Sequence, residues 1–367
     1  RLVTRAAAVL RRQQTFTFTM AAAVSTADAA GGGGCSSELS RVARFIASDD
    51  CQNICILSGA GVSVAAGIPD FRSPGGMYDT LKPELITATP RQRSLMATDP
   101  TYVVEYDMFM ENAYPYLEVR RPFILGTAKQ QWKATISHHF FDLLHEQGKL
   151  TRLYTQNIDG LDFQTHIPRD KIVPVHGSIG AVACEACNHP MDTGAFCELV
   201  QSNIKDIYRK DAEAPSESSP ILCEKCGKPT VKPTTVLFGA GLPEVFFDSM
   251  VEDLPTCDLL IVAGTSLVVS PANMVAYKVP STTMRLVANR EPVGQELGIT
   301  YGTEGGRDVF AEGDCDECFA QLAQELGLMG KLMERYDLLP EASQLLLDRL
   351  DGNGGGGNEG GVAADVD

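Results

Sequence analysis

Short apolar runs alternate with helical patterns along most of this chain. The runs read as buried strands, at 53–57, 150–154, 172–175, 259–263 and 285–288. Helical patterns occur at 40–48, 136–147 and 271–277. Strands that alternate with helices form a parallel sheet, because each crossover helix covers a face of it. The sequence therefore predicts an α/β fold with a doubly wound parallel sheet.

Two long segments interrupt the alternation. Residues 75–135 are rich in apolar and aromatic side chains but show no sheet pattern, and residues 184–226 contain an exposed loop rich in Ser, Pro and Glu at 211–220. Gly31–Gly34 reads as a flexible linker, and the Gly- and acid-rich segment Asp351–Asp367 is predicted to be a disordered tail. These interruptions predict a second, smaller domain beside the sheet.

Two cysteine pairs in the second interruption predict a metal site. Cys184-x2-Cys187 and Cys223-x2-Cys226 are separated by 35 residues. Two such pairs supply four thiolates, which close a tetrahedral zinc site and leave no position for water. We therefore expect a structural Zn²⁺. The alternative is two unrelated thiol pairs.

A third pair, Cys315-x2-Cys318, is predicted not to bind metal. Acidic residues at 314, 316 and 317 flank it and would raise the pKa of its thiols. The pair also opens an amphipathic helix. His189, beside the first zinc pair, is a weaker candidate ligand that we interpret as a surface loop residue.

Composition limits the function classes. The chain has 367 residues, 44% of them hydrophobic, and a formal net charge of −16. Such a charge repels a phosphate backbone, so we expect no direct nucleic-acid binding. No apolar run approaches the roughly 20 residues that span a bilayer, so we expect no membrane partner. The 11 cysteines without a secretory signal favour metal ligands and reduced thiols over disulfides.

The turn Gly59-x-Gly61 follows the first predicted strand. Such a turn brings backbone N–H groups close to a pyrophosphate. Val64 stands where the dinucleotide fingerprint has its third glycine, and no acid takes the ribose-binding place on a second strand. An ordinary hydride-transferring dehydrogenase is therefore disfavoured.

The residues around this turn, and several later segments, identify the family. The matching segments are Gly59-Ala60-Gly61-Val62-Ser63, Ala66-Gly67-Ile68-Pro69-Asp70-Phe71-Arg72-Ser73, Thr155-Gln156-Asn157-Ile158-Asp159-Gly160-Leu161, His176-Gly177-Ser178, the four zinc cysteines, Phe238-Gly239, Leu242-Pro243, Gly264-Thr265-Ser266 and Asn289. In this order they resemble the sirtuin family, and the match is closest to its eukaryotic class I type. The resemblance covers about Leu39 to Leu328.

The resemblance implies a two-domain architecture. The large domain would be a Rossmann-type doubly wound parallel sheet, and the smaller one would combine a zinc module with a helical module. The implied boundaries are 1–38 for a flexible or targeting segment, 39–330 for the catalytic domain and 331–367 for a C-terminal helix and disordered acidic tail. Within the catalytic domain they are 39–74, 136–181 and 232–330 for the Rossmann-type part, 75–135 for the helical module and 182–231 for the zinc module.

The resemblance also implies an activity. A sirtuin is an NAD-dependent protein lysine deacetylase, which transfers the acetyl group to ADP-ribose and releases nicotinamide. NAD would be the co-substrate, Zn²⁺ structural, and acetylated protein lysines the partners. Alternatives are a protein mono-ADP-ribosyltransferase and a catalytically silent zinc-containing binding module. The intact residues Asn157, Asp159 and His176 favour the deacetylase.

Residue roles are carried over position by position. His176 matches the general base, which suits a histidine because its pKa lies near working pH. Asn157, also assigned to catalysis, and Asp159 match residues that hold the nicotinamide ribose and carboxamide. The other residues implied to bind the cofactor are Gly59, Ala60, Gly61, Ser63, Asp70, Phe71, Arg72, Gln156, Gly264, Thr265, Ser266, Asn289 and Cys315.

The chain departs from the family pattern in two places. About a dozen extra residues lie between Tyr114 and Thr135, near the helical module, and they put the shape of the acyl pocket in doubt. The peptide-pairing segment, expected at Phe238–Gly241 opposite a loop at Val268–Pro271, lacks the family's acidic residue. His138 and His139 lie in an apolar helix and are interpreted as structural.

The first residues leave two interpretations open. Arg1–Ala27 contains four arginines and no acid, which is typical of an organelle transit peptide. The alternative is that Met20 is the true start. We expect an intracellular protein of the cytoplasm or nucleus, with the mitochondrion as the alternative. The sequence does not indicate the oligomeric state.

Overall fold

The computed structural model describes residues 34–68, 78–303 and 305–352. The strands are β1 (Ile54–Ser58), β2 (Leu150–Thr155), β3 (Ile172–Pro174), β4 (Val182–Cys184), β5 (Pro190–Met191), β6 (Val231–Pro233), β7 (Leu259–Ala263), β8 (Met284–Asn289) and β9 (Asp308–Glu312). The α-helices are α2 (Gly34–Ala47), α3 (Pro90–Thr98), α4 (Tyr106–Glu111), α5 (Tyr114–Ala128), α6 (Ile136–Glu146), α7 (Thr193–Asn203), α8 (Glu244–Asp253), α9 (Val275–Lys278), α10 (Cys315–Glu325), α11 (Met329–Met333) and α12 (Glu341–Leu350). Short 3-10 helices include η1 (Ala60–Ala66), η4 (Leu161–Gln164) and η7 (Ala272–Met274).

The main sheet has six parallel strands in the order β3-β2-β1-β7-β8-β9. From β1 the chain adds β2 and then β3 on one side. It then adds β7, β8 and β9 on the other side of β1. The order therefore reverses between β1 and β7. In open α/β sheets, ligands bind beyond the carboxyl ends of the strands at such a switch point. The predicted doubly wound parallel sheet is confirmed.

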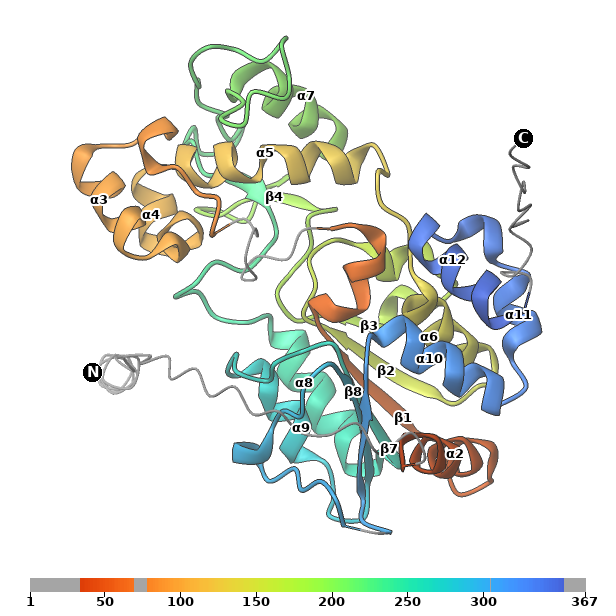
Figure 1. Cartoon of the computed structure of the whole chain (residues 1–367). Coiled ribbons are helices and arrows are strands. Elements are labelled where there is room, and N and C mark those ends of the chain that lie inside the picture. The colour runs from red at the N-terminus through yellow and green to blue at the C-terminus, as the bar shows by residue number, and fades with distance from the viewer. Residues whose placement is uncertain (1–33, 69–77, 304, 353–367) are drawn as a thin grey trace, which may run out of the picture. The chain divides into compact units, whose positions relative to one another are not determined.

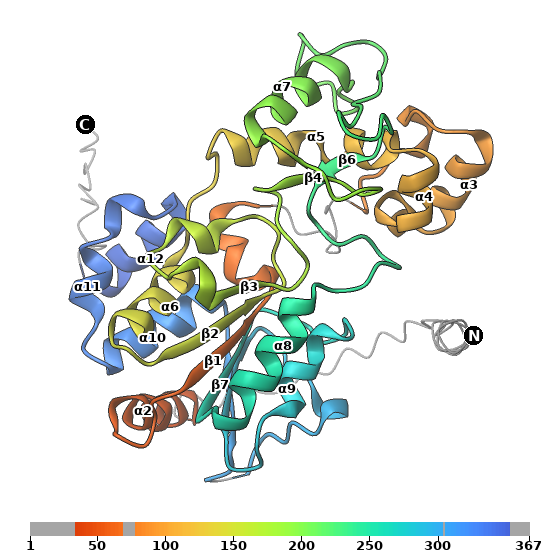
Figure 2. The ribbon, with the colours of Figure 1, turned by 180° about the vertical axis from the view of Figure 1, so that it is seen from behind.

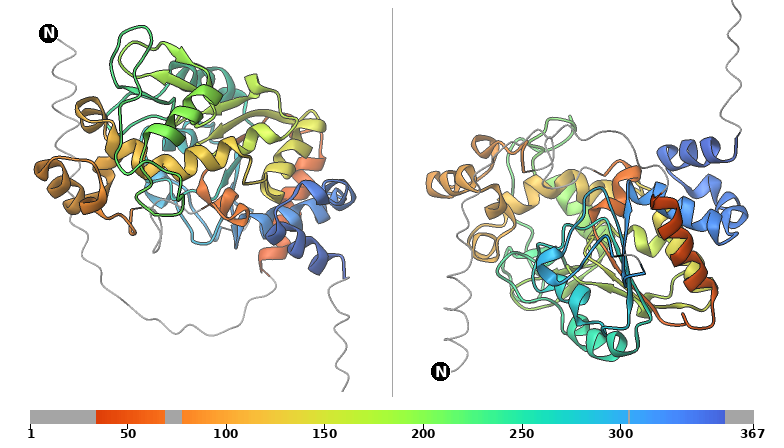
Figure 3. Two further views of the ribbon diagram at one scale, coloured as in Figure 1. Left: turned by 90° about the horizontal axis from the view of Figure 1, so that it is seen from above. Right: turned by 60° about the horizontal axis from the view of Figure 1, so that its bottom comes forward.

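Helices cover both faces of this sheet. Successive residues of a strand point to opposite faces, so each strand contributes apolar side chains to two cores. In β1, Ile54 and Ile56 join a core with residues of α2, α6, α10 and the C-terminal helices, whereas Cys55 and Leu57 join a second core with α8 and α9. Figure 1 shows these two layers, and Figure 2 shows them from behind. The C-terminal helices, blue in Figure 3, again lie away from α8 and α9.

A second lobe holds a separate core. Its small antiparallel sheet has the order β5-β4-β6, and α3, α4, α5 and α7 pack around it (Figure 1). Phe109 of α4 and Tyr116 of α5 meet edge to face at 5.4 Å in this core, and Phe196 of α7 is fully buried there. The predicted domain boundaries stay a prediction.

The structure differs from the expected elements in three places. Helix α2 begins at Gly34, so the last residues of the segment predicted to be flexible are helical. Strand β9 was not predicted, and the helix expected at 271–277 is split into η7 and α9. Residues 78–135, which the resemblance assigns to the helical module, are mainly helical.

None of the helices in the described ranges is long and apolar enough to cross a bilayer.

Candidate active site

The turn after β1 is built from three glycines of two strands. Gly59 and Gly61 both donate backbone hydrogen bonds to the β7 end, to the carbonyls of Ala263 and Gly264, at 2.9 Å. A Cβ on Gly61 would lie 2.4 Å from the Cα of Gly264, and one on Gly264, whose φ is +59°, would lie 2.5 Å from the Cα of Gly61. Gly264, directly after β7, therefore completes this turn.

The two peptide segments can approach this closely only without side chains. The result is a bare backbone cradle at the switch point, which a pyrophosphate can approach closely because no side chain stands between them. The residues present fit a dinucleotide at this place. Helix η1, which follows the turn, is a 3-10 helix and is shorter than an ordinary crossover helix.

The predicted cofactor residues that the structure describes come from the carboxyl ends of different strands. They are Gly59, Ala60, Gly61 and Ser63 after β1, Gln156, Asn157 and Asp159 after β2, Gly264, Thr265 and Ser266 after β7, Asn289 at the end of β8 and Cys315 after β9. Asp70, Phe71 and Arg72 lie outside the described residues. Because all these strands are parallel, their carboxyl ends share one edge of the sheet.

Three polar side chains close the inner wall of this site. Asn157 donates from Nδ2 to the carbonyl of Gly59 at 3.0 Å and to Oγ of Ser63 at 3.2 Å. Ser63 in turn donates to Oδ2 of Asp159 at 2.7 Å. Ser63 and Asp159 are buried and Asn157 is half-buried, so the amide and hydroxyl have fixed orientations. The wall joins the β1 turn to the segment after β2.

Asp159 lies beside a buried cluster that the sequence interpretation missed. His138 of α6 and Asp162 of η4 face Asp159, and the three residues offer ligand atoms within 4.8 Å of one another. Burial is the main cause that raises the pKa of Asp159, and burial also raises the pKa of Asp162 to about 6. No local pattern marks this cluster, because His138 comes from α6 and the two aspartates come from the segment after β2.

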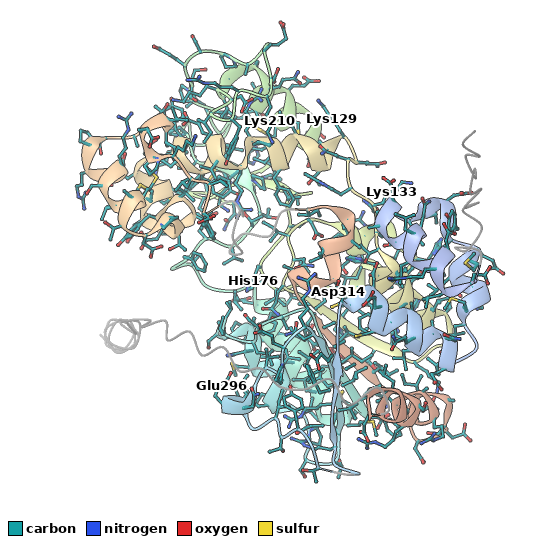
Figure 4. The ribbon with its side chains drawn as sticks, in the orientation of Figure 1. Lys129, Lys133, His176, Lys210, Glu296 and Asp314 are labelled. Carbon is teal, nitrogen blue, oxygen red and sulfur yellow. The ribbon has the colours of Figure 1, made fainter. Side chains whose placement is uncertain are left out.

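His176 follows β3 and is half-buried. Its Nδ1 lies 3.0 Å from the carbonyl oxygen of Gln156. A carbonyl only accepts, so Nδ1 carries the proton in the neutral ring and Nε2 is the nitrogen that can take one up. Figure 4 labels His176 between the sheet and the smaller lobe. This is the protonation pattern that a general base requires.

The other described cofactor candidates differ in how they can reach a ligand. Gln156 donates to Oγ1 of Thr265 at 3.0 Å and so joins the β2 and β7 ends. Ser266 is exposed, and Asn289 donates to the carbonyl of Glu291 at 2.8 Å. Cys315 is different, because its thiol is buried and points to the carbonyl of Ala288 at 3.6 Å. Its side chain faces the core, so only its main chain is available at the strand edge.

The four predicted zinc cysteines come together. The sulfur atoms of Cys184, Cys187, Cys223 and Cys226 lie within 4.8 Å of one another. The pairs Cys184–Cys226 and Cys187–Cys223 are 3.6 and 3.7 Å apart, too far for disulfides. Zn–S bonds of about 2.3 Å in a tetrahedron place sulfurs about 3.8 Å apart. The cluster therefore fits a structural Zn²⁺ whose positions are all filled by thiolates.

The other cysteine pair and the ring of His189 lie apart from this cluster. Cys318 is buried with its sulfur 3.6 Å from the carbonyl of Ala311, and neither it nor Cys315 belongs to the four-cysteine cluster. His189 contributes its backbone carbonyl to Cys184 N–H at 2.9 Å, and its ring is not part of the cluster.

The segment expected to bind peptide is already paired on one edge. Phe238 donates its N–H to Val104 O and accepts from Tyr106 N–H, both at 2.9 Å, in a parallel bridge to the smaller lobe. Its side chain is 41% exposed. An added strand would therefore have to pair along the other edge, where Gly239 has a φ of +88°. Upstream, Val236 donates to His176 O at 2.8 Å, which links this segment to the candidate base.

The insertion between Tyr114 and Thr135 forms most of helix α5 and its exit. Glu118, fully buried, accepts from Thr87 N–H at 2.9 Å and from the Ser218 hydroxyl at 2.6 Å. Arg121 forms an ion pair with Asp211 at 2.6 Å. The insertion therefore joins the helices of residues 78–111 to the zinc-binding part by polar contacts.

Comparison with known proteins agrees with this geometry. The model of the Sir2 family matches residues 59–271. The chain is 34% identical to the NAD-dependent protein deacetylase sirtuin-2 of Danio rerio over 81% of its own length and 74% of the relative. It is 32% identical to the NAD-dependent protein deacetylase hst2 of Schizosaccharomyces pombe over 85% of both chains, and 35% identical to HST2 of Candida albicans over 78% of its own length and 76% of the relative. With the Rossmann strand order, the glycine cradle and the four-cysteine cluster, this chain belongs to the Sir2 family.

Proposed function

We propose that this protein is an NAD-dependent protein lysine deacetylase. The observation that carries the proposal is the position of His176. It follows β3 at the edge where the glycine cradle lies, and Gln156 O fixes its tautomer at 3.0 Å. Several relatives are named NAD-dependent protein deacetylases, which supports the same activity and a protein substrate.

NAD would be held by backbone groups at its pyrophosphate and by polar side chains at its nicotinamide end. Gly59, Gly61 and Gly264 would bring their backbone to the pyrophosphate. Asn157 and Asp159 would hold the nicotinamide end, where the inner wall presents an amide and a buried carboxylate. When bound, NAD supplies a ribose carbon that accepts the acetyl oxygen as nicotinamide leaves.

The chain itself would supply orientation and a proton acceptor. Nε2 of His176 would take the proton of a ribose hydroxyl, and the hydrogen bond from Nδ1 to Gln156 would hold the ring in place during that transfer. The buried wall around Ser63 would exclude water from the reacting sugar. Zn²⁺ on the four cysteines would act on structure only.

The test follows nicotinamide release and peptide mass with an acetyl-lysine peptide and NAD. We expect NAD-dependent loss of the acetyl mass. His176→Ala should lower turnover at least about 100-fold, because general-base catalysis contributes on this order. His145→Ala, on the distal half of α6, is the matched control and should leave turnover unchanged.

Other outcomes would support the rival functions. Intact acetyl peptide together with ADP-ribose mass added to protein would indicate a mono-ADP-ribosyltransferase. An absence of NAD turnover with acetyl, longer-chain and acidic acyl peptides would indicate a silent zinc-containing binding module. The acyl series matters because the insertion at 114–135 lies in the smaller lobe.

A further inference from the structure

Helix α8 presents three large apolar side chains to solvent. Val245, Phe247 and Val251 are 49%, 39% and 77% exposed, within a helix of ten residues. Single exposed apolar side chains are common on protein surfaces, but several of them together indicate a place where another molecule binds. The inner face of α8 packs on the sheet through Phe246 and Met250, so the three exposed residues are not part of the core.

The helix geometry arranges the outward residues of α8 in two adjacent rows. Residues four apart lie next to each other on a helix surface. Phe247 and Val251 therefore form an apolar row, and Glu244 and Asp248 form an acidic row beside it. Val245 flanks the acidic row on its other side. In the part of the chain that the structure describes, neither Glu244 nor Asp248 has an ion-pair partner.

The ring of Phe247 is already held in place. It meets the ring of the buried Phe246 edge to face, with the centroids 5.1 Å apart and the planes at 65°. An aromatic side chain that is ordered in advance loses little entropy when a partner covers it, and such residues dominate the binding energy of many interfaces. Phe247 is therefore the anchor of this surface, and Val251 extends it by one helical turn.

The charge of this surface limits which partner fits it. Helix α8 contains no lysine or arginine. The next carboxylate of the acidic row, Glu252, lies 3.7 Å from Arg152 and is partly neutralised, so Glu244 and Asp248 carry the charge that a partner meets. These carboxylates repel nucleic acid and anionic lipid headgroups. A polypeptide with lysine or arginine next to apolar side chains complements both rows.

The position of α8 in the chain indicates which polypeptide this is. Only Leu242 and Pro243 separate the helix from the expected peptide-pairing segment Phe238–Gly241. From Glu244 to Val251 the helix rises about 10 Å, a distance that an extended chain crosses in about three residues. A substrate that pairs with the first segment therefore reaches the rows of α8 with residues that lie beyond its acetyl-lysine.

We propose that the two rows of α8 form a docking surface for protein substrates, and that the surface takes a basic segment with apolar residues, several positions away from the acetyl-lysine. The proposal rests on the proposed function, because the partner is the acetylated protein itself. Apolar side chains of the segment cover Phe247 and Val251, and its cationic side chains pair with Glu244 and Asp248. Docking is made equally in the ground state and the transition state, so it lowers KM and leaves kcat unchanged.

The kinetic test uses the full chain and acetyl-lysine peptides that differ only in their flanks. The reference peptide is short, one peptide adds flanks of alternating lysine and leucine at both ends, and one adds flanks of alternating glutamate and serine. Lysine–leucine flanks should lower KM about tenfold, which two partly buried apolar side chains and two exposed ion pairs provide together. Glutamate–serine flanks should not lower it. Higher ionic strength should reduce the advantage, because exposed ion pairs are screened.

Variants of α8 assign this advantage to the two rows. Phe247→Ser/Val251→Ser should abolish the lower KM of the lysine–leucine peptide. Glu244→Gln/Asp248→Asn should remove its salt dependence and part of the advantage. The kcat for the short peptide should stay at the wild-type level in both variants, which also shows that they fold.

Helix α12 provides the matched control. It also has ten residues, but it packs on the opposite face of the sheet through Leu346 and Leu347. Leu345→Ser/Glu341→Gln replaces an exposed leucine and an exposed carboxylate on α12 and should change neither KM nor kcat with any of the peptides.

Three results would overturn the proposal. One is an undiminished KM advantage in Phe247→Ser/Val251→Ser, and another is a loss of kcat for the short peptide in that variant, because the row would then act through the fold. The third is a wild-type chain that sediments as a dimer while the variant sediments as a monomer, because a second copy of the chain would then cover the rows.

A binding measurement separates this proposal from the proposed function. Fluorescence anisotropy of the labelled, unacetylated lysine–leucine peptide is measured without NAD and should show binding that is lost in Phe247→Ser/Val251→Ser. If the protein releases no nicotinamide, the proposed function fails, and binding that depends on Phe247 still supports the docking surface. Equal affinity of wild type and variant for this peptide would exclude the surface.

Discussion

The ammonium group of Lys232 lies 2.9 Å from the carboxylate of Glu185, inside the smaller lobe. Glu185 stands between the first two zinc cysteines, and Lys232 lies on β6, is only 2% exposed and also donates to the carbonyl of Thr235 at 2.6 Å. Phe109 and Tyr116 face the same ammonium at 5.9 and 6.0 Å. The Lys232 ammonium thus connects the zinc-binding turn, the segment that begins at Thr235, and helices α4 and α5.

Replacing Lys232 should destabilise the smaller lobe. Lys232→Met keeps the length of the side chain but leaves the Thr235 carbonyl and Glu185 without their donor. We expect a loss of about 2 kcal/mol in the free energy of unfolding, measured by urea denaturation. Lys82→Met, at an exposed site, is the matched control and should stay within about 0.5 kcal/mol of wild type. Equal stability of the two variants would show that the buried ammonium makes no net contribution.

Removing one zinc thiolate should release the metal. Cys223→Ser replaces a buried member of the cluster, and we expect zinc content to fall from one per chain toward zero, together with a lower melting temperature. Zinc analysis by mass spectrometry and thermal denaturation check both. Cys197→Ser, a half-buried cysteine outside the cluster, should keep its zinc. Full zinc occupancy in Cys223→Ser would contradict the assigned ligand set.

The glycine cradle should not tolerate a methyl group. In Gly61→Ala the new Cβ would lie 2.4 Å from the Cα of Gly264, and backbone on both sides cannot move far. We expect a loss of about 1–3 kcal/mol in unfolding free energy and strongly weakened NAD binding by calorimetry. Gly330→Ala, where nothing lies within 4 Å, should be neutral or slightly stabilising. NAD affinity at the wild-type level in Gly61→Ala would exclude the cradle as the pyrophosphate site.

The buried ion pair Arg285–Asp308 should make stability depend on pH. Arg285 is 1% exposed and holds Asp308 with two bonds, of 2.5 and 2.7 Å. Burial alone would raise the pKa of Asp308, but hydrogen bonds from Arg285 and from Thr300 N–H reverse this and leave it lowered. The pair therefore stabilises fully above the unfolded pKa of about 4, and this contribution is lost as pH falls further, through the folded pKa.

Asp308→Asn should therefore cost about 3–5 kcal/mol at neutral pH, because Arg285 stays buried without its counter-charge. The difference from wild type should shrink below the unfolded pKa. Urea unfolding at neutral pH and at a pH below the unfolded pKa measures this difference. Asp314→Asn removes an exposed ion pair with Arg290 and should cost less than about 1 kcal/mol. A pH-independent deficit in Asp308→Asn would mean that packing, not charge, explains the loss.

The sequence predicted those elements that a short run of neighbouring residues is enough to specify. The strands β1, β2, β7 and β8 were found because each is a buried apolar run, and the four cysteines were found because their spacing fits a zinc site. Local patterns did not show the helices of residues 78–128, and only the family resemblance implied a helical module there. Helix α5, for example, buries Glu118 and Arg121 as well as Leu117, so no single apolar stripe marks it. Strand β9 was missed because it carries acids at both ends.

The site was predicted in its parts but not in how they combine. His138 was interpreted as structural because a histidine in an apolar helix gives no sign of what faces it. Asp162 comes from another segment, and only the packing of η4 against α6 brings the two together. Cys315 was predicted beside the cofactor, but the register of α10 turns its thiol toward the core.

Because the cradle needs Gly61 close to Gly264, ligand binding there also depends on the docking of the two central strands. The cradle does not exist in either segment alone, because it is completed only when β7 has docked against β1. A dinucleotide bound there stabilises the docked state and not the separated one, so its binding free energy adds to the pairing of the two central strands. Saturating ligand should therefore slow amide hydrogen exchange in β1 and β7, the strands that end directly before the cradle.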